Sequence, residues 1–240
     1  MTGSLPELRR HAQTLLNDQS PADALASYYA LHHPAERTEL FVHWADNAAR
    51  PDGFLARART GLDLFRPLVT FRAATEATAQ ALFLEGLVPG RPVYLTVPEP
   101  LAEWANQHLS VTDAEWHHVY RFNPAKHTPH LNALAVLNLN PDGTPRCEIR
   151  SGGEVSAVAG VNWQGPRFAE VYVYVDPAKR GRGWARAVVS SVANALVAVG
   201  RTPLYVVAES NENSIRVAEA VGFEDTGWRE YVGQAVRLSH

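Results

Sequence analysis

Cysteine, lysine and long hydrophobic runs are all scarce in this 240-residue chain, and each scarcity excludes a class of protein. The single cysteine, Cys147, excludes an intrachain disulfide and any metal site built from several cysteines. No apolar run approaches the roughly 20 residues of a membrane span, and the first residues lack the hydrophobic core of a signal peptide. We therefore expect a cytoplasmic protein with no membrane partner.

The charges are nearly balanced, with 22 basic and 25 acidic side chains. This balance argues against nucleic-acid binding, which needs a continuous basic surface. Lysine occurs only at Lys126 and Lys179, and arginine supplies the other basic residues. Nine of the ten histidines lie at or before His130, and the tenth is His240. The two halves of the chain therefore differ in the chemistry available to them.

The length allows a single core, but two packed domains are at least as compatible with it, and the proline-containing stretch Asn123–His130 is the expected crossing between them. We place the domains at residues 1–125 and 126–240. Both are predicted to be α/β. Helical patterns are expected at residues 4–16, 20–32, 73–86, 99–109, 183–199 and 213–221. The run AEVYVYV at residues 169–175 has the Val/Tyr alternation of a central strand, and a short tail is expected after Gly222.

A glycine-containing loop follows that strand in the stretch VYVYVDPAKRGRGWARAVV. Gly181 and Gly183 let the backbone approach a ligand, and the amides and positive dipole end of the following helix attract an anion. Arg180 and Arg182 add positive charge with donors suited to phosphate oxygens. The sequence Trp184-Ala185 stands where a nucleotide P-loop needs Lys-Ser or Lys-Thr, and the third glycine of a dinucleotide loop is missing. The loop predicts a different phosphate or pyrophosphate ligand.

The run RGRGWA at residues 180–185 resembles the R-x-x-G-x-A acyl-CoA loop of the GNAT superfamily of N-acetyltransferases. Asn211, Gly222 and Phe223 reproduce the family's asparagine-to-Gly-Phe spacing, and the resemblance covers about residues 132–231. It implies a GNAT-like mixed β-sheet flanked by helices in the C-terminal domain. The N-terminal α/β domain is compatible with a degenerate GNAT-like half, as in tandem members, although no cofactor loop is visible in it.

The resemblance also implies a reaction, the transfer of an acetyl group from acetyl-CoA to a primary amine within a ternary complex. The loop amides and arginines would hold the pyrophosphate, and backbone groups of the preceding strand would pair with the pantetheine arm. The implied cofactor-binding residues are Val173, Tyr174, Val175, Arg180, Gly181, Arg182, Gly183, Trp184, Ala185 and Asn211.

Two glutamates are candidates for the base that the acceptor amine requires. Glu170 looks like the glutamate in the FAE segment of histone-type members, with a spacing to the cofactor strand one residue shorter than in those enzymes. Glu209 follows the next strand. Because nearly all the histidines lie at or before His130, the alternative to a glutamate base is a histidine lent by the N-terminal domain. Ala218 occupies the usual position of the tyrosine that protonates the thiolate, so Tyr231, Ser214 or no side chain would serve.

One alternative function, the question of a metal site and the identity of the acceptor remain beside this interpretation. The departure at Ala218 is compatible with a non-catalytic acyl-CoA-binding module of GNAT fold. No metal site is expected, because the adjacent histidines at 32–33 and 117–118 would point to opposite faces of a strand. His127 and His130 lie in a proline-rich loop without a nearby carboxylate or cysteine ligand. The acceptor is a small-molecule or peptide amine of unidentified structure, and a homodimer is compatible with the sequence.

Overall fold

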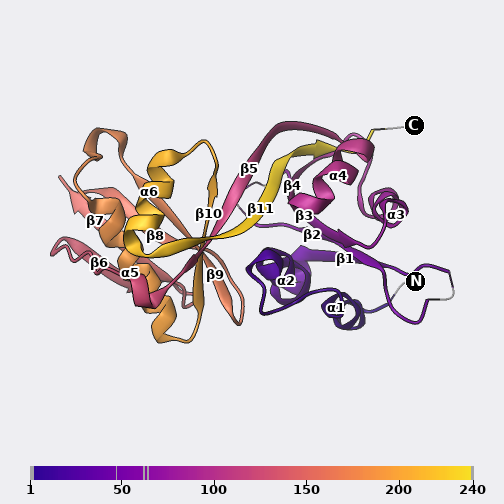
Figure 1. Cartoon of the computed structure of the whole chain (residues 1–240), viewed down its shortest axis with the longest axis horizontal. Coiled ribbons are helices and arrows are strands. Elements are labelled where there is room, and N and C mark those ends of the chain that lie inside the picture. Colours follow the sequence, from indigo (N-terminus) through magenta and orange to yellow (C-terminus); the bar gives the residue numbers. More distant parts are fainter. Residues whose placement is uncertain (1–2, 47, 62, 64, 239–240) are drawn as a thin grey trace. The chain divides into compact units, whose positions relative to one another are not determined.

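The chain folds into two compact units in the computed structural model, which describes residues 3–46, 48–61, 63 and 65–238. Unit 1 comprises Met1–His117 and Trp228–His240, and unit 2 comprises His118–Gly227. Both changes of unit fall inside long strands, β5 (Ser110–Phe122) and β11 (Phe223–Val236) (Figure 1). The prediction of a short tail after Gly222 was wrong, because the residues that follow Gly222 form the long strand β11. The domain ranges 1–125 and 126–240 stay a prediction.

Unit 2 contains the two motifs that resemble those of the GNAT superfamily, the acyl-CoA loop and the asparagine-to-Gly-Phe spacing. Besides parts of β5 and β11, its elements are β6 (Ala135–Leu139), β7 (Pro145–Ser151), β8 (Glu154–Gln164), β9 (Phe168–Val175), α5 (Trp184–Ala198), β10 (Thr202–Ala208) and α6 (Glu212–Val221). Strands β6, β7, β8 and β9 are paired antiparallel in that order, and β10 is parallel to β9. The predicted helices in this half are confirmed to within a residue or two of their ends.

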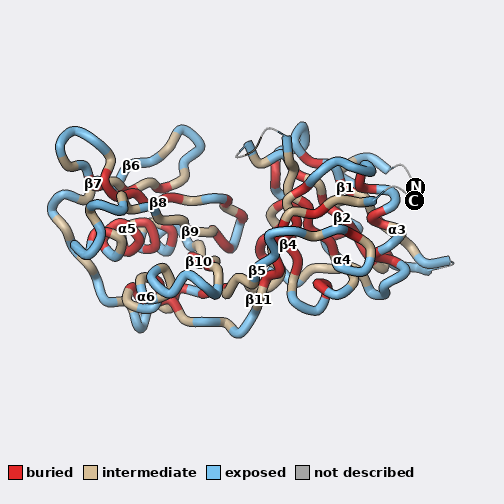
Figure 2. Tube along the Cα trace, turned by 90° about the horizontal axis from the view of Figure 1, so that it is seen from above, coloured by how far each residue is buried: buried red, intermediate tan, exposed pale blue. Residues whose placement is uncertain are grey.

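Helix α5 packs on one face of this sheet because its apolar residues recur at helical spacing. Val188, Val192 and Leu196 are fully buried in a core that also includes Ile149 of β7 and Val171 of β9. Figure 2 shows buried residues along α5 and exposed ones along β6. The rigid α5–sheet contact fixes where the loop before α5 emerges.

Strands β9 and β10 pair over only a short part of their length. Their register runs from Thr202 opposite Phe168 to Leu204 opposite Glu170. Strand β9 continues to Val175, still paired with β8 on its other side. Within the described part of the chain, β9 therefore has an edge without a registered partner strand beyond Glu170.

From β1 onward, unit 1 repeats the order of elements that unit 2 has from β7 onward. The elements of unit 1 are α1 (Leu5–Gln13), α2 (Ala24–Ser27), β1 (Thr38–His43), β2 (Gly53–Ala58), β3 (Leu68–Ala73), α3 (Glu76–Gly86), β4 (Pro92–Pro98) and α4 (Ala102–His108). Strands β1, β2 and β3 are antiparallel, and β4 is parallel to β3 over two registered pairs only. Antiparallel strands followed by a helix and a parallel, diverging strand thus occur in both units. The N-terminal α/β half has the GNAT-like topology that the sequence suggested.

The second predicted helix, at residues 20–32, is interrupted in the structure. Its residues form a 3-10 turn at Pro21–Asp23, the short helix α2 and a π-helical turn at Tyr28–His32. The Ser20 side chain accepts a hydrogen bond from the Ala22 amide, as expected of an N-cap. Among the described residues, none of the helices is both long and apolar enough to cross a membrane.

Candidate functional site

The loop between β9 and α5 has the backbone that its glycines predicted. Gly181 and Gly183 have φ values of 79° and 73°, in the left-handed region that favours glycine. A Cβ built at either position meets no atom within 4 Å, and both residues are exposed. The loop backbone is therefore open to a ligand from outside.

The start of α5 offers amides and positive charge at the same place. The first intrahelical bond within α5 runs from the Ala187 amide to the Gly183 carbonyl, so the amides of the first turn precede the helical ladder. No acidic side chain lies in this turn. Arg180 and Arg182 are exposed, and the Arg182 guanidinium lies 5.2 Å from the centre of the Trp184 ring. The helix dipole would stabilise an anion at this end, and both arginines add positive charge to the same loop.

Trp184 has a structural role that its place in the motif did not predict. Its side chain is only 8% exposed and belongs to the core beneath α5, so its indole anchors the helix start. Ala185 is partly buried one residue further on. These two residues can meet a ligand through their backbone amides.

The unpaired edge of β9 carries the backbone groups expected to pair with an extended ligand. In an antiparallel ladder, successive residues direct their N–H and C=O groups to opposite sides. The Asp176 amide donates to the Ser156 carbonyl of β8, so Val173 and Val175 direct theirs away from β8. These groups point to the other side of β9, where β10 diverges beyond Glu170. Tyr174 directs its backbone to β8, and its side chain is 55% exposed.

Asn211 is the N-cap of α6, and its side chain accepts a hydrogen bond from the Ser214 amide at 3.2 Å. Since β9 and β10 are parallel, the residues after β10 lie at the same sheet edge as the loop after β9. Asn211 therefore caps α6 and lies at the same end of the sheet as the loop between β9 and α5. Its contact with a cofactor stays a prediction.

Glu170 lies opposite a β-bulge in β8. Both Asn162 and Trp163 face this one residue, because the register shifts between Val161 and Trp163. The Asn162 Nδ2 donates to Oε1 of Glu170 at 2.6 Å, and the Trp163 indole Nε1 donates to Oε2 at 2.5 Å. Both carboxylate oxygens thus accept hydrogen bonds from β8.

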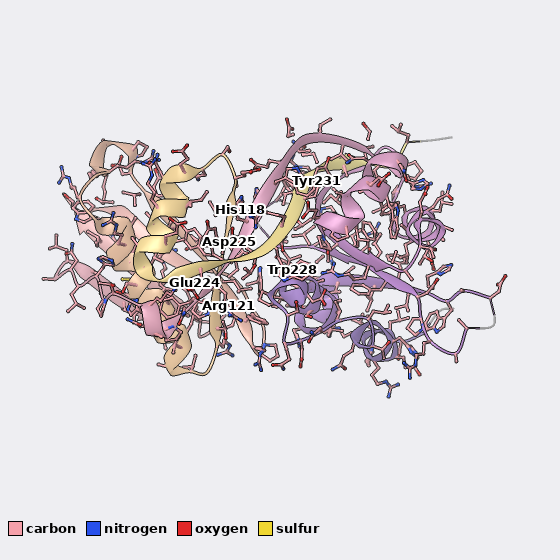
Figure 3. All side chains as sticks on the ribbon, in the orientation of Figure 1. His118, Arg121, Glu224, Asp225, Trp228 and Tyr231 are labelled. Atoms are coloured by element: carbon pink, nitrogen blue, oxygen red, sulfur yellow. The ribbon has the colours of Figure 1, made fainter. Side chains whose placement is uncertain are left out.

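Glu209 lies directly after β10 and is brought beside two residues that the sequence did not single out. Its Oε1 is 3.9 Å from Nε2 of His118 on β5, and Nδ1 of His118 is 3.1 Å from Oδ2 of Asp225 on β11. Figure 3 labels His118 and Asp225, which come from these two strands. Sequence spacing could not find this cluster, because His118 lies more than 80 residues before both Glu209 and Asp225.

The proposed replacements for the tyrosine missing at position 218 are engaged elsewhere. Ala218 itself is fully buried. The Ser214 hydroxyl lies 2.7 Å from that of Tyr205, whose pKa is raised by burial. Tyr231 belongs to unit 1 and donates its hydroxyl to Oδ1 of Asn106 at 2.8 Å.

The histidines of the proline-containing stretch stabilise the end of α6. His127 Nδ1 bonds the Val221 carbonyl at 2.8 Å, and His130 Nε2 bonds the Ala220 carbonyl at 3.0 Å. These carbonyls lie in the last helical turn, which lacks intrahelical donors. Among the described residues, no group of three or more histidine, cysteine, aspartate or glutamate side chains could hold a metal.

The helix of unit 1 that corresponds to α5 has no comparable anion site. The N-cap of α3 is Thr75, whose hydroxyl accepts from the Thr78 amide, and the first helical residue is the acidic Glu76. The Thr78 hydroxyl donates to Oδ2 of Asp52 at 2.7 Å. Side-chain oxygens and two carboxylates therefore occupy the helix end where a phosphate would need amides and cations.

Comparison with known proteins agrees with this geometry. A profile for the family described as FR47-like protein matches residues 149–232, which include β9, the loop and α5. No curated protein matches the chain. Solved structures give 55 matching chains.

Three of these structures illustrate the similarity. A GNAT-family protein from Novosphingobium aromaticivorans has 22% identity and a TM-score of 0.58, covering 77% of this chain and 89% of its own. A GCN5-related N-acetyltransferase from Kribbella flavida has 14% identity and a TM-score of 0.63, with 91% and 96% covered. A tandem GNAT protein from the clavulanic acid biosynthesis pathway has 16% identity and a TM-score of 0.58, with 98% and 94% covered. The chain therefore has the GNAT fold, and its resemblance to the GNAT superfamily is confirmed.

Proposed function

We propose that the chain is an N-acetyltransferase that moves an acetyl group from acetyl-CoA to a primary amine by direct transfer in a ternary complex. The observation that supports this most is the joint position of an open phosphate loop and an unpaired strand edge in one unit. A pyrophosphate fits the amides and arginines at the start of α5, and an extended pantetheine arm fits the free edge at Val173 and Val175.

Acetyl-CoA supplies an activated thioester to this site, and the chain supplies the binding groups. Arg180, Arg182 and the amides from Gly181 to Ala185 would hold its phosphates. Backbone N–H groups on the β9 edge can also donate to the thioester carbonyl as negative charge develops there. Asn211, at the same edge of the sheet, is the proposed contact on the pantetheine side.

The base acts on the acceptor amine, which must be neutral to attack. Glu170 is the first candidate by its place in β9, and its two hydrogen bonds from Asn162 and Trp163 hold it rigidly. Glu209 is the second, with a side chain that is 66% exposed. A Glu170→Gln variant should lower the rate at neutral pH and recover part of it at high pH. An unchanged rate assigns the role to the Glu209 side of the site.

Unit 1 repeats the topology without a usable anion site, so unit 2 alone is proposed to bind the cofactor. The acceptor is a small-molecule or peptide amine, and neither a membrane nor a nucleic acid is a proposed partner. A homodimer and a cytoplasmic location remain proposals as well.

The test is an acetyl-CoA-dependent thiol-release screen over small amines, aminoglycosides, amino acids and peptides. Release that requires one of these amines, with an acetylated product of the expected mass, supports the enzyme. Binding of acetyl-CoA without thiol release in the presence of any of these amines favours the alternative function, a non-catalytic acyl-CoA-binding module. The absence of the usual tyrosine at position 218, where Ala218 stands, is the observation behind this alternative.

A further inference from the structure

A histidine–aspartate pair lies in unit 2 outside every residue assigned so far. His118 Nδ1 is 3.1 Å from Oδ2 of Asp225. The other oxygen of Asp225, Oδ1, accepts from the Gly227 amide at 2.9 Å, which fixes the carboxylate. The imidazole also stacks on the Tyr120 ring, with centroids 6.2 Å apart and an angle of 21°. The ring of His118 is therefore held from two sides.

This arrangement defines which nitrogen of His118 is basic. A carboxylate only accepts hydrogen bonds, so Nδ1 carries the proton in the neutral ring and Nε2 carries the lone pair. Nε2 is buried and has no hydrogen-bond partner among the described residues. The nearest ionisable group is Glu209, with Oε1 at 3.9 Å. An oriented imidazole with an unsatisfied, basic nitrogen is the arrangement that removes protons in other enzymes.

The pair borders the edge at which the cofactor is proposed to bind. Glu209 directly follows β10, and the carboxyl ends of β9 and β10 point to the same end of the sheet because these strands are parallel. His118 lies against Glu209 at this end. The Glu209 side chain is 66% exposed, so it can move off Nε2 when an acceptor arrives.

Resting on the acetyl transfer proposed above, we propose that His118 is the base for the acceptor amine, Asp225 its positioning residue and Glu209 the counter-charge for the incoming ammonium. The amine nitrogen bonds the acetyl carbon, the carbon–sulfur bond breaks, and the thiolate leaves with the electron pair of that bond. The proton lost by nitrogen goes to Nε2 of His118, which then passes it to the thiolate or to water.

The surroundings of His118 also define the acceptor class. Carboxylates face it from two directions, Asp225 on β11 and Glu209 after β10, and Glu219 of α6 lies 3.5 Å from the hydroxyl of the stacked Tyr120. This local charge attracts cations and repels carboxylates. The preferred acceptor is an alkylammonium group without a carboxylate beside it.

The test compares four variants of the full-length chain with an alkylamine acceptor found in the thiol-release screen. His118→Gln should lower kcat/KM at pH 7.5 by about 10²-fold, the lower range for general-base catalysis. It should also remove the acidic limb of the pH profile. Asp225→Asn should lower kcat by about tenfold or more, and Glu209→Gln should mainly raise KM. His117→Gln, one residue away in an exposed ion pair, is the matched control and should leave both constants unchanged.

Coenzyme A affinity measured by calorimetry separates catalysis from folding in every variant. A His118→Gln protein that binds coenzyme A normally and has lost its activity and pH limb supports the assignment. One that binds normally and keeps the wild-type rate and profile overturns it, while the acetyltransferase itself stands. Failure of the wild-type protein to acetylate any amine overturns the proposed function and this assignment with it. If His118→Gln does not fold, the Asp225→Asn profile decides by the same criteria.

Discussion

A left-handed glycine in the phosphate loop and its counterpart in a distant turn give a matched pair for testing the cofactor site. Gly181 before α5 and Gly143 in the turn between β6 and β7 both have φ of 79°. A Cβ at either meets nothing within 4 Å, and both residues are exposed in unit 2. Replacement by alanine should therefore cost each protein the same conformational strain, about 1–2 kcal/mol. Urea denaturation measures this cost.

The two variants should differ in their binding of coenzyme A. Relief of the strain in Gly181→Ala rotates the loop amides away from the proposed pyrophosphate, and the new methyl group lies on the open side of the loop. We expect a loss of at least tenfold in affinity, equivalent to about 1.4 kcal/mol. Gly143→Ala should stay within about twofold of the wild type in calorimetry. Equal affinities for both variants, despite equal losses of stability, would refute the assignment of this loop.

Three further predictions concern the stability of the two units. Thr75→Ala removes the N-cap of α3 and should lower the free energy of unfolding by about 1 kcal/mol in urea denaturation. Cys147 is fully buried and burial raises the pKa of its thiol, so a thiol reagent at pH 8 should label it only as the protein unfolds, and rapid labelling of the folded protein would contradict its placement. Burial lowers the pKa of His33 in the folded protein, so below pH about 6.5 the unfolded chain binds more protons than the folded one. The free energy of unfolding should therefore fall as the pH is lowered from 7.5 to 5.5. His33→Gln should reduce that fall relative to the exposed control His11→Gln.

The elements around the cofactor loop could be predicted because their signals are local. The apolar spacing of α5, the Val/Tyr alternation of β9 and the glycines of the loop each act within a few residues. Their positions in the structure agree with the sequence: α5 begins at Trp184 and α6 at Glu212, each one residue from its expected start. The edge left open beyond Glu170 follows from strand pairing, and only the structure reveals where that pairing stops.

His118, the base inferred from the structure, could not be found from the sequence for the opposite reason. His118 reaches unit 2 on a strand that begins in unit 1, and Asp225 and Glu209 join it through pairing between segments far apart in the chain. The confinement of histidine to the first half indicated that any histidine base would come from there. The distribution of histidines carried no information on which of these nine residues would be the base. Similarly, the tail after Gly222 has too mixed a pattern to predict the long strand β11.

Calorimetric titration with coenzyme A tests the central claim most directly, with the wild-type chain compared against an Arg182→Glu, Gly183→Asp double variant. Both substitutions place negative charge at the start of α5 without touching its buried core. The account predicts saturable binding to the wild type and no detectable binding to a variant that remains folded. Equal affinity for the two proteins would contradict the placement of the cofactor, and with it the acetyltransferase site built around it.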